Sequence, residues 1–333
     1  MTQSEYPKPP NGYGESDGGQ AWTRSGTAPQ GSTVPFRSAE RRPALGLRPL
    51  LISALSILAA IGGAVPVSAR QAAPGSNVPV AVQLYTLDCG LTEFKDASAF
   101  SDTGEYDGRS VALPTPCYLV HHGKDWLLWD TGNGDRLAAL PHGEEKFGGR
   151  FSMRRTLVGQ LADLGLKPDD IRYVAISHLH QDHAGNIGLF PKATFLIATS
   201  ELAWARGKPT PFGVDPAVVA LLAQAHLDAS DDDRDVFGDK TVRILKAPGH
   251  TPGSRILLVK LAKSGTVLVS GDLYHTRENY EKGLVPSPNI SRADTLASFQ
   301  RFARVAANTH ARVVIQHSPE DFAAMPAFPK FLD

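Results

Sequence analysis

The sequence predicts an α/β fold for residues 70–333. Three observations predict it: short apolar runs rich in β-branched residues recur along this stretch, amphipathic helical patterns lie between them, and histidine or aspartate follows several of the runs. Strands that alternate with amphipathic helices favour layers of sheet and helix. Polar side chains just past strand ends are typical of binding sites in such sheets. Apolar residues make up 42% of the chain, enough for a sizeable core.

The elements alternate along the chain. Within 112–132, two apolar runs flank the turn at His122–Asp125 and predict a hairpin. The pattern at 153–166 predicts a helix, with Gly165 as its C-terminal cap. Further strands are expected at 80–87, 170–177, 193–198, 240–247, 254–262, 265–271 and 311–317, and further helices at 215–226 and 291–308.

The first part of the chain differs from this domain in composition. Residues 1–40 are rich in Gly, Pro, Ser and Thr and are predicted to be disordered. Residues 41–69 combine Arg41 and Arg42, an apolar run, and Val67-x-Ala69. This pattern predicts a signal peptide cleaved after Ala69, with an uncleaved membrane anchor as the alternative. Both place the domain at 70–333 outside the cytoplasm, and cleavage would make it periplasmic or secreted.

Two cysteines, Cys89 and Cys117, lie in or beside predicted strands. In an exported protein they could pair as a disulfide. They could equally be small buried hydrophobic residues on neighbouring strands, because the sequence does not give the separation of their Cα atoms.

A dense group of metal-ligand side chains follows the strand at 170–177. It is the run His178-Leu-His180-Gln-Asp182-His183. Imidazole nitrogens and carboxylate oxygens suit Zn²⁺ and similar divalent ions, and a loop leaving a strand can turn several of them inward. The alternative, a polar turn of unrelated histidines, does not account for this density.

This run, followed by Ala184 and Gly185, resembles the signature of the metallo-β-lactamase superfamily. Segments resembling other motifs of that superfamily occur in the same order: Trp129-Asp130-Thr131-Gly132, Ala247-Pro-Gly-His250, Ser270-Gly-Asp272 and Val314-Ile-Gln-His317. The resemblance implies a four-layer αβ/βα sandwich and two divalent transition metal ions, with Zn²⁺ expected. It implies one ion held by His178, His180 and His250, and a second held by Asp182, His183 and His317, with Asp272 bridging both.

Within the superfamily, the sequence is most similar to the N-acyl-homoserine lactonases. The similar segments are 84–90, 272–279 and 317–322, with a closing Phe328-Pro329 pair. The resemblance implies that the protein opens the lactone ring of N-acyl-homoserine lactones, which is quorum quenching. A metal-bridging hydroxide would attack the carbonyl, and Asp182 would carry the proton to the leaving alkoxide.

One departure concerns the substrate side of the site. These lactonases have a tyrosine at the position of His275, whereas here the tyrosine is one residue earlier, at Tyr274. His275 could donate the hydrogen bond that the tyrosine hydroxyl would donate, or Tyr274 could turn in instead. Both therefore stand beside Asp182 as candidate catalytic residues.

Other functions remain open at this point. The same site could hydrolyse a β-lactam, a thioester or an organophosphate, and a non-catalytic metal-binding protein is a further alternative. The expected partner is a small lactone or related ester. A formal net charge of zero gives no reason to expect nucleic acid. After cleavage we expect no stable membrane contact, and the sequence leaves a homodimer open.

Overall fold

The computed structural model describes residues 80–333. The predicted disordered extension (1–40) and the predicted signal peptide or anchor (41–69) lie outside the described residues. Within residues 80–333, no helix is both long enough and apolar enough to cross a membrane.

The larger of two sheets has nine strands and is built mostly from the first half of the domain. Its order is β4-β5-β1-β2-β3-β6-β7-β8, with β14 also paired to β1. The antiparallel part runs from β4 to β3, and β3, β6, β7 and β8 are parallel. The strands are β1 (Val82–Phe94), β2 (Val111–His122), β3 (Asp125–Trp129), β4 (Glu144–Lys146), β5 (Gly149–Ser152), β6 (Tyr173–Ala175), β7 (Thr194–Ile197), β8 (His226–Ala229) and β14 (Phe331–Leu332).

The second sheet has five strands in the order β13-β12-β11-β10-β9. Only the pair of β12 and β13 is parallel. The strands are β9 (Arg234–Asp235), β10 (Val242–Lys246), β11 (Arg255–Leu261), β12 (Gly265–Val269) and β13 (Arg312–Val314).

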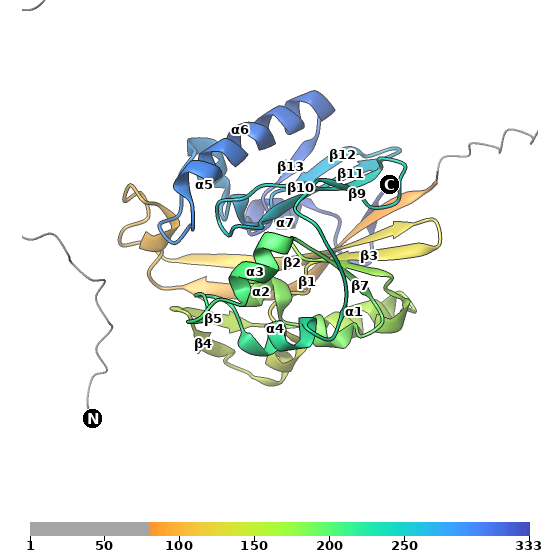
Figure 1. The fold of residues 1–333 in the computed structure, drawn as a ribbon, viewed down its shortest axis with the longest axis horizontal. Coiled ribbons are helices and arrows are strands. Elements are labelled where there is room, and N and C mark those ends of the chain that lie inside the picture. The colour runs from red at the N-terminus through yellow and green to blue at the C-terminus, as the bar shows by residue number, and fades with distance from the viewer. Residues whose placement is uncertain (1–79) are drawn as a thin grey trace, which may run out of the picture. The chain divides into compact units, whose positions relative to one another are not determined.

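Helices cover the outer faces of both sheets (Figure 1). They are α1 (Leu157–Asp163), α2 (Gln181–Ala184), α3 (Thr199–Ala205), α4 (Pro216–Leu222), α5 (Arg277–Lys282), α6 (Arg292–Thr309) and α7 (Pro319–Ala324). The longest, α6, starts at the cap Ser291, whose side chain accepts a hydrogen bond from the amide of Asp294.

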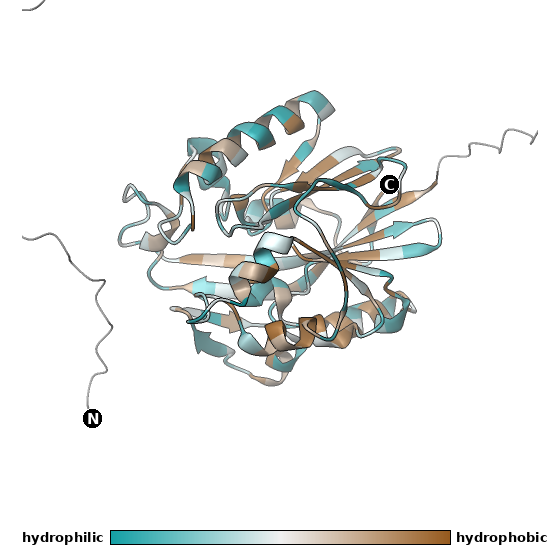
Figure 2. Ribbon diagram, in the orientation of Figure 1, coloured by the Kyte–Doolittle hydropathy of each residue, from teal (hydrophilic) through white to brown (hydrophobic). Residues whose placement is uncertain are grey.

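Three hydrophobic layers hold the four layers of structure together. One joins the inner faces of the two sheets and includes Trp129, Leu257 and Val267. Another packs α1 to α4 on the larger sheet, and a third packs α6 and the segment before α5 on the smaller sheet. In Figure 2, hydrophobic colour accordingly follows strands of both sheets and one side of the helices. The predicted αβ/βα sandwich is confirmed.

Most of the expected elements are present, and the predicted hairpin turns between β2 and β3. The C-terminal turn of α1 is followed by Gly165 with a φ of +73°, a left-handed conformation that glycine adopts without strain. Short elements such as β4, β8, β14 and α7 were not predicted, since a few residues carry too little periodicity to identify them.

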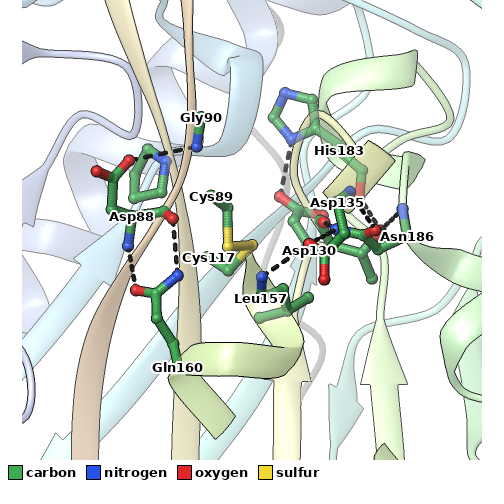
Figure 3. The surroundings of a disulfide bond; sticks show 12 residues. Asp88, Cys89, Gly90, Cys117, Asp130, Asp135, Leu157, Gln160, His183 and Asn186 are labelled. Atoms are coloured by element: carbon green, nitrogen blue, oxygen red, sulfur yellow. Dashed lines mark hydrogen bonds and ion pairs between the residues drawn. A yellow bond between two sulfur atoms is a disulfide. The ribbon is translucent and has the colours of Figure 1, made fainter. Parts of the chain in front are cut away.

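Cys89 and Cys117 form a disulfide between β1 and β2, with their Cα atoms 5.7 Å apart. Figure 3 shows the bond beside the loop that follows β3. The carbonyl of Cys89 accepts a hydrogen bond from the amide of Asn133. A Cβ atom on Gly132 would lie 2.4 Å from Cβ of Cys89, so only glycine allows this approach. The disulfide therefore lies against a loop that supports the site described next.

Candidate metal centre

The seven predicted metal ligands come together between the two sheets, at the ends of four strands. His178 and His180 follow β6, and Asp182 and His183 lie in α2, which starts directly after them. The remaining ligands lie after β10, β12 and β13 and are His250, Asp272 and His317, respectively. Most are nearly inaccessible to solvent. The strands thus deliver side chains from distant parts of the sequence to one place.

One group of potential ligand atoms belongs to His178, His180 and His250, which all lie within 4.8 Å of one another. Nδ1 of His180 is 3.0 Å from Nε2 of His250. Gly213 lies against the imidazole of His180, and a Cβ atom on this glycine would be 2.6 Å from that ring. The loop after α3 therefore closes on the group.

A second group consists of Asp182, His183 and His317. The Nε2 atoms of the two histidines are 3.1 Å apart. Oδ2 of Asp182 is 3.6 Å from Nε2 of His183 and 3.8 Å from Nε2 of His317. The three side chains thus converge from two elements, α2 and the loop after β13.

Asp272 lies between the two groups and presents one oxygen to each. Its Oδ1 atom is 3.1 Å from Nε2 of His183 and 2.9 Å from Nε2 of His317. Its Oδ2 atom is 3.7 Å from Nε2 of His178 and 3.5 Å from Nε2 of His250. This is the arrangement expected of a carboxylate shared by two cations.

The lowered pKa values of the first group and the contacts of His178 fit a metal site. Burial lowers the pKa of His180 to about 3 and that of His250 to about 4, so both imidazoles are neutral, as ligation requires. Nε2 of His178 is buried without a hydrogen-bond partner and faces this same space. Burial also acts to lower the pKa of His183, but Asp272 and the neighbouring carboxylates outweigh it and raise this pKa.

Hydrogen bonds behind the ligands fix the direction of their rings. Nδ1 of His183 is 2.8 Å from Oδ2 of Asp130. Nδ1 of His317 is 2.8 Å from the carbonyl of Pro114, and Nδ1 of His250 is 3.0 Å from Oδ1 of Asn289. In each case the Nδ1 atom is engaged, which leaves Nε2 directed at the centre.

Glu201 in α3 braces the two loops that carry the first group. Its Oε1 atom accepts a hydrogen bond from the amide of Leu179, and its Oε2 atom accepts from Thr251 and from the amide of Gly253. The carboxylate is buried, and burial raises its pKa despite these bonds. It thus connects the loop of His178 and His180 to the loop of His250.

The family model for the metallo-beta-lactamase superfamily matches residues 111–317, which include all seven of these side chains. The chain belongs to the metallo-β-lactamase superfamily. Its fold implies binding of divalent metal ions, and the histidine–aspartate groups above suit that role.

Several members of this superfamily are similar over nearly their whole length. The N-acyl homoserine lactonase AttM of Azorhizobium caulinodans is 32% identical over 265 residues, which are 76% of this chain and 99% of that protein. The crystal structure of a quorum-quenching N-acyl homoserine lactone hydrolase has a TM-score of 0.66 at 27% identity, covering 76% of this chain and 98% of that one. A further solved structure, of an N-acyl homoserine lactone hydrolase with the product N-hexanoyl-L-homoserine bound at the catalytic metal centre, has a TM-score of 0.65 at 26% identity, covering 76% of this chain and 99% of that one.

The side chains of His275 and Tyr274 point in different directions in this metallo-β-lactamase fold. His275 faces inward, with its Nε2 atom 3.2 Å from Oδ2 of Asp272 and its ring 5.2 Å from that of Phe100. Tyr274 points away from the metal centre, and its ring stacks on that of Phe299 at 4.3 Å within the core under α6. Of the two candidates, only His275 reaches the metal centre.

Several supporting residues were not identified from the sequence. Asp130 stood out as part of a motif, but nothing local showed that it contacts His183. Gln316 donates a hydrogen bond to Asp130 and accepts one from Trp129, and its place next to His317 in the sequence indicates neither bond. Glu201 and Asn289 carry no sequence signal, because their partners are far away along the chain.

Proposed function

We propose that the protein is a di-metal hydrolase that opens the lactone ring of N-acyl-homoserine lactones. The observation that carries this proposal is the position of Asp272, whose two oxygens face two separate groups of imidazoles. A purely structural metal site needs only one closed set of four ligands. Two adjoining groups around one carboxylate favour hydrolysis instead.

The ligand sets are those implied by the resemblance, with Zn²⁺ as the proposed ion. His178, His180 and His250 would hold one ion, Asp182, His183 and His317 the other, and Asp272 both. When bound, two such ions supply an activated water and a Lewis acid for the substrate carbonyl.

The side chains around the centre have separate tasks in ring opening. The side chain of Asp182 is partly accessible, with 19% of it exposed, so its carboxylate can accept a proton and pass it to the leaving alkoxide. His275 offers an N–H to the carbonyl oxygen from the opposite side, where its ring lies between Phe100 and His250. Tyr274 takes no part, because its ring is enclosed in the core.

Apolar side chains beside the centre suit an acyl chain. The ring of Trp204 is 5.8 Å from that of His180. Phe212, which precedes the glycine that touches His180, has 65% of its surface exposed and packs on Phe147 at 5.2 Å. Exposed apolar side chains that adjoin one another beside a site are typical of ligand-binding grooves. We propose that this surface receives the acyl group of the substrate.

A comparison of rates tests the substrate class. Purified metal-loaded protein would be assayed with acyl-homoserine lactones of several chain lengths, a simple lactone, a β-lactam and a phosphotriester. We expect the highest kcat/KM with acyl-homoserine lactones and about two metal equivalents per chain by elemental analysis. Faster turnover of the β-lactam or the phosphotriester would overturn the proposed substrate, and full activity with a single equivalent would overturn the two-metal site.

We also propose that the domain works outside the cytoplasm. The sequence pattern at 41–69 predicts export, and the buried disulfide between Cys89 and Cys117 supports it. Structural disulfides persist in oxidising compartments and are rare in the cytosol of most organisms.

A further inference from the structure

Arg255 is a buried cation outside the metal centre, and its side chain has no hydrogen-bond or ion-pair partner among residues 80–333. Arg255 is the first residue of β11, and only 3% of it is exposed to solvent. The Nη2 atom is buried without a hydrogen-bond partner. Among residues 80–333, no ion pair joins it to an acid. An unpaired buried charge is strongly unfavourable, so buried arginines are normally paired.

Strand pairing makes this position more unfavourable still. Arg255 lies directly opposite Lys246 in the antiparallel pair of β10 and β11. Side chains that are directly opposite lie on the same face of a sheet, and like charges there repel each other. Burial lowers the pKa of Arg255 to about 10, so it still carries its charge at neutral pH.

Two neighbouring arginines are paired with acids. Arg234 forms an ion pair with Asp228, and Arg301 forms one with Asp233. Of these three arginines, Arg255 is therefore the one whose side chain contacts no acid within residues 80–333.

Arg255 lines a cavity of about 150 Å³. The rest of the lining includes Ser200, Asp231, Lys246 and Ser254. Lys246 and Asp231 are exposed, whereas Ser254 and Arg255 are buried, so the cavity leads from the surface to the guanidinium. The volume is enough for a small polyatomic ion, and a guanidinium is the side chain best suited to an oxyanion.

Asp231 determines which oxyanion fits. Its Oδ1 atom accepts hydrogen bonds from the amide and the hydroxyl of Ser200. These bonds keep it ionised by lowering its pKa, with the backbone bond from Ser200 as the largest cause. An ionised carboxylate only accepts hydrogen bonds, so it repels an anion that has no proton to donate.

We propose that this cavity is a binding site for inorganic phosphate. The anionic oxygens would accept hydrogen bonds from Arg255 and Lys246, and the P–OH group would donate to Asp231. Sulfate has the same shape but no proton at neutral pH, so it should bind more weakly. The cavity wall includes Pro248 and Ser254 of the loop that carries His250, so a bound ion would also stabilise that loop.

A crystallographic experiment locates the ion directly. Crystals of the metal-loaded protein would be soaked in arsenate, a phosphate analogue with a strong anomalous signal. We expect an arsenic peak in the cavity, with the arsenate oxygens within hydrogen-bond distance of the Arg255 guanidinium, whatever peak also occurs at the metals. A peak at the metals alone would overturn the proposal, and this test needs no variant.

A binding experiment separates the cavity from the metal centre. Titration of the metal-loaded protein with phosphate should show weaker cavity binding in Arg255→Met, by about 10- to 100-fold, as expected for lost hydrogen bonds to a charged group. Arg255→Lys should lie between. Arg234→Met is the matched control, because it removes a nearby paired charge that does not line the cavity, and it should bind as the wild type does. Equal phosphate binding by Arg255→Met and wild type, or sulfate binding as tight as phosphate, would contradict the proposal.

Discussion

The Nε2 atom of His275 lies 3.2 Å from Oδ2 of Asp272, the carboxylate that faces both groups of metal ligands. This contact places an imidazole where the resemblance to the lactonases leads us to expect a tyrosine. It therefore connects the main sequence departure of this protein to its chemistry.

We predict that His275→Ala lowers kcat by a factor on the order of 10², because a donor to the developing negative charge is lost. Metal content, measured by elemental analysis, should not change. Tyr274→Phe is the comparison and should leave kcat nearly unchanged, since its ring lies in the core. Loss of a metal equivalent in His275→Ala would show that His275 is a ligand rather than a donor.

Asp272→Ala should lose one metal equivalent and most of the activity. A carboxylate between two cations offsets their mutual repulsion, and both oxygens are used here. Metal content and turnover would be compared with those of Asp232→Ala, which changes an exposed aspartate away from the centre. Normal metal content in Asp272→Ala would rule out a bridging role.

Asp130→Asn tests the hydrogen bond behind His183. Asp130 has a φ of +59°, which asparagine also tolerates, so the backbone should stay in place. The weaker acceptor should reduce metal affinity by about 10- to 100-fold, as for other partners of ligating histidines. The control is Asp125→Asn at the other end of β3, which removes a surface ion pair with Arg172. If chelator titration gives the two variants equal affinities, Asp130 does not orient the ligand.

The disulfide should contribute to stability rather than to chemistry. It closes a loop with a sequence separation of 28. Chain entropy then predicts that the double variant Cys89→Ala/Cys117→Ala loses about 3 to 4 kcal/mol of unfolding free energy in urea. Its kcat at a temperature where it remains folded should match that of the wild type. An unchanged unfolding midpoint would indicate that the two thiols are not joined in the purified protein.

Export predicts a shortened mature chain. In the native host, N-terminal sequencing should find a start just after Ala69, and the protein should be recovered outside the cytoplasm. A cytoplasmic product that begins near Met1 would contradict export, and it would also remove the reason to expect an oxidised pair of cysteines.

Much of the site was predictable because its central part is local. Four ligands lie between His178 and His183, so one strand end and one helical turn suffice to gather them. The outlying ligands, such as His250, were identified by resemblance and strand order, since strand ends on one edge of a sandwich meet. The strands and long helices followed from the periodicity of their apolar residues.

The sequence by itself thus determined the fold class and the family, and it predicted the set of metal ligands that the fold brings together. Only the tertiary structure decided which of His275 and Tyr274 faces the metal centre. In the segment after β12 these consecutive side chains point in different directions, one into the site and the other into the core. The structure also decided that Cys89 and Cys117 meet, and that Glu201 spans two ligand loops. The tertiary structure likewise showed that Arg255 is buried without an acid in contact with it among residues 80–333. Each of these depends on which distant side chains the packing of two sheets brings together, and no local pattern encodes that.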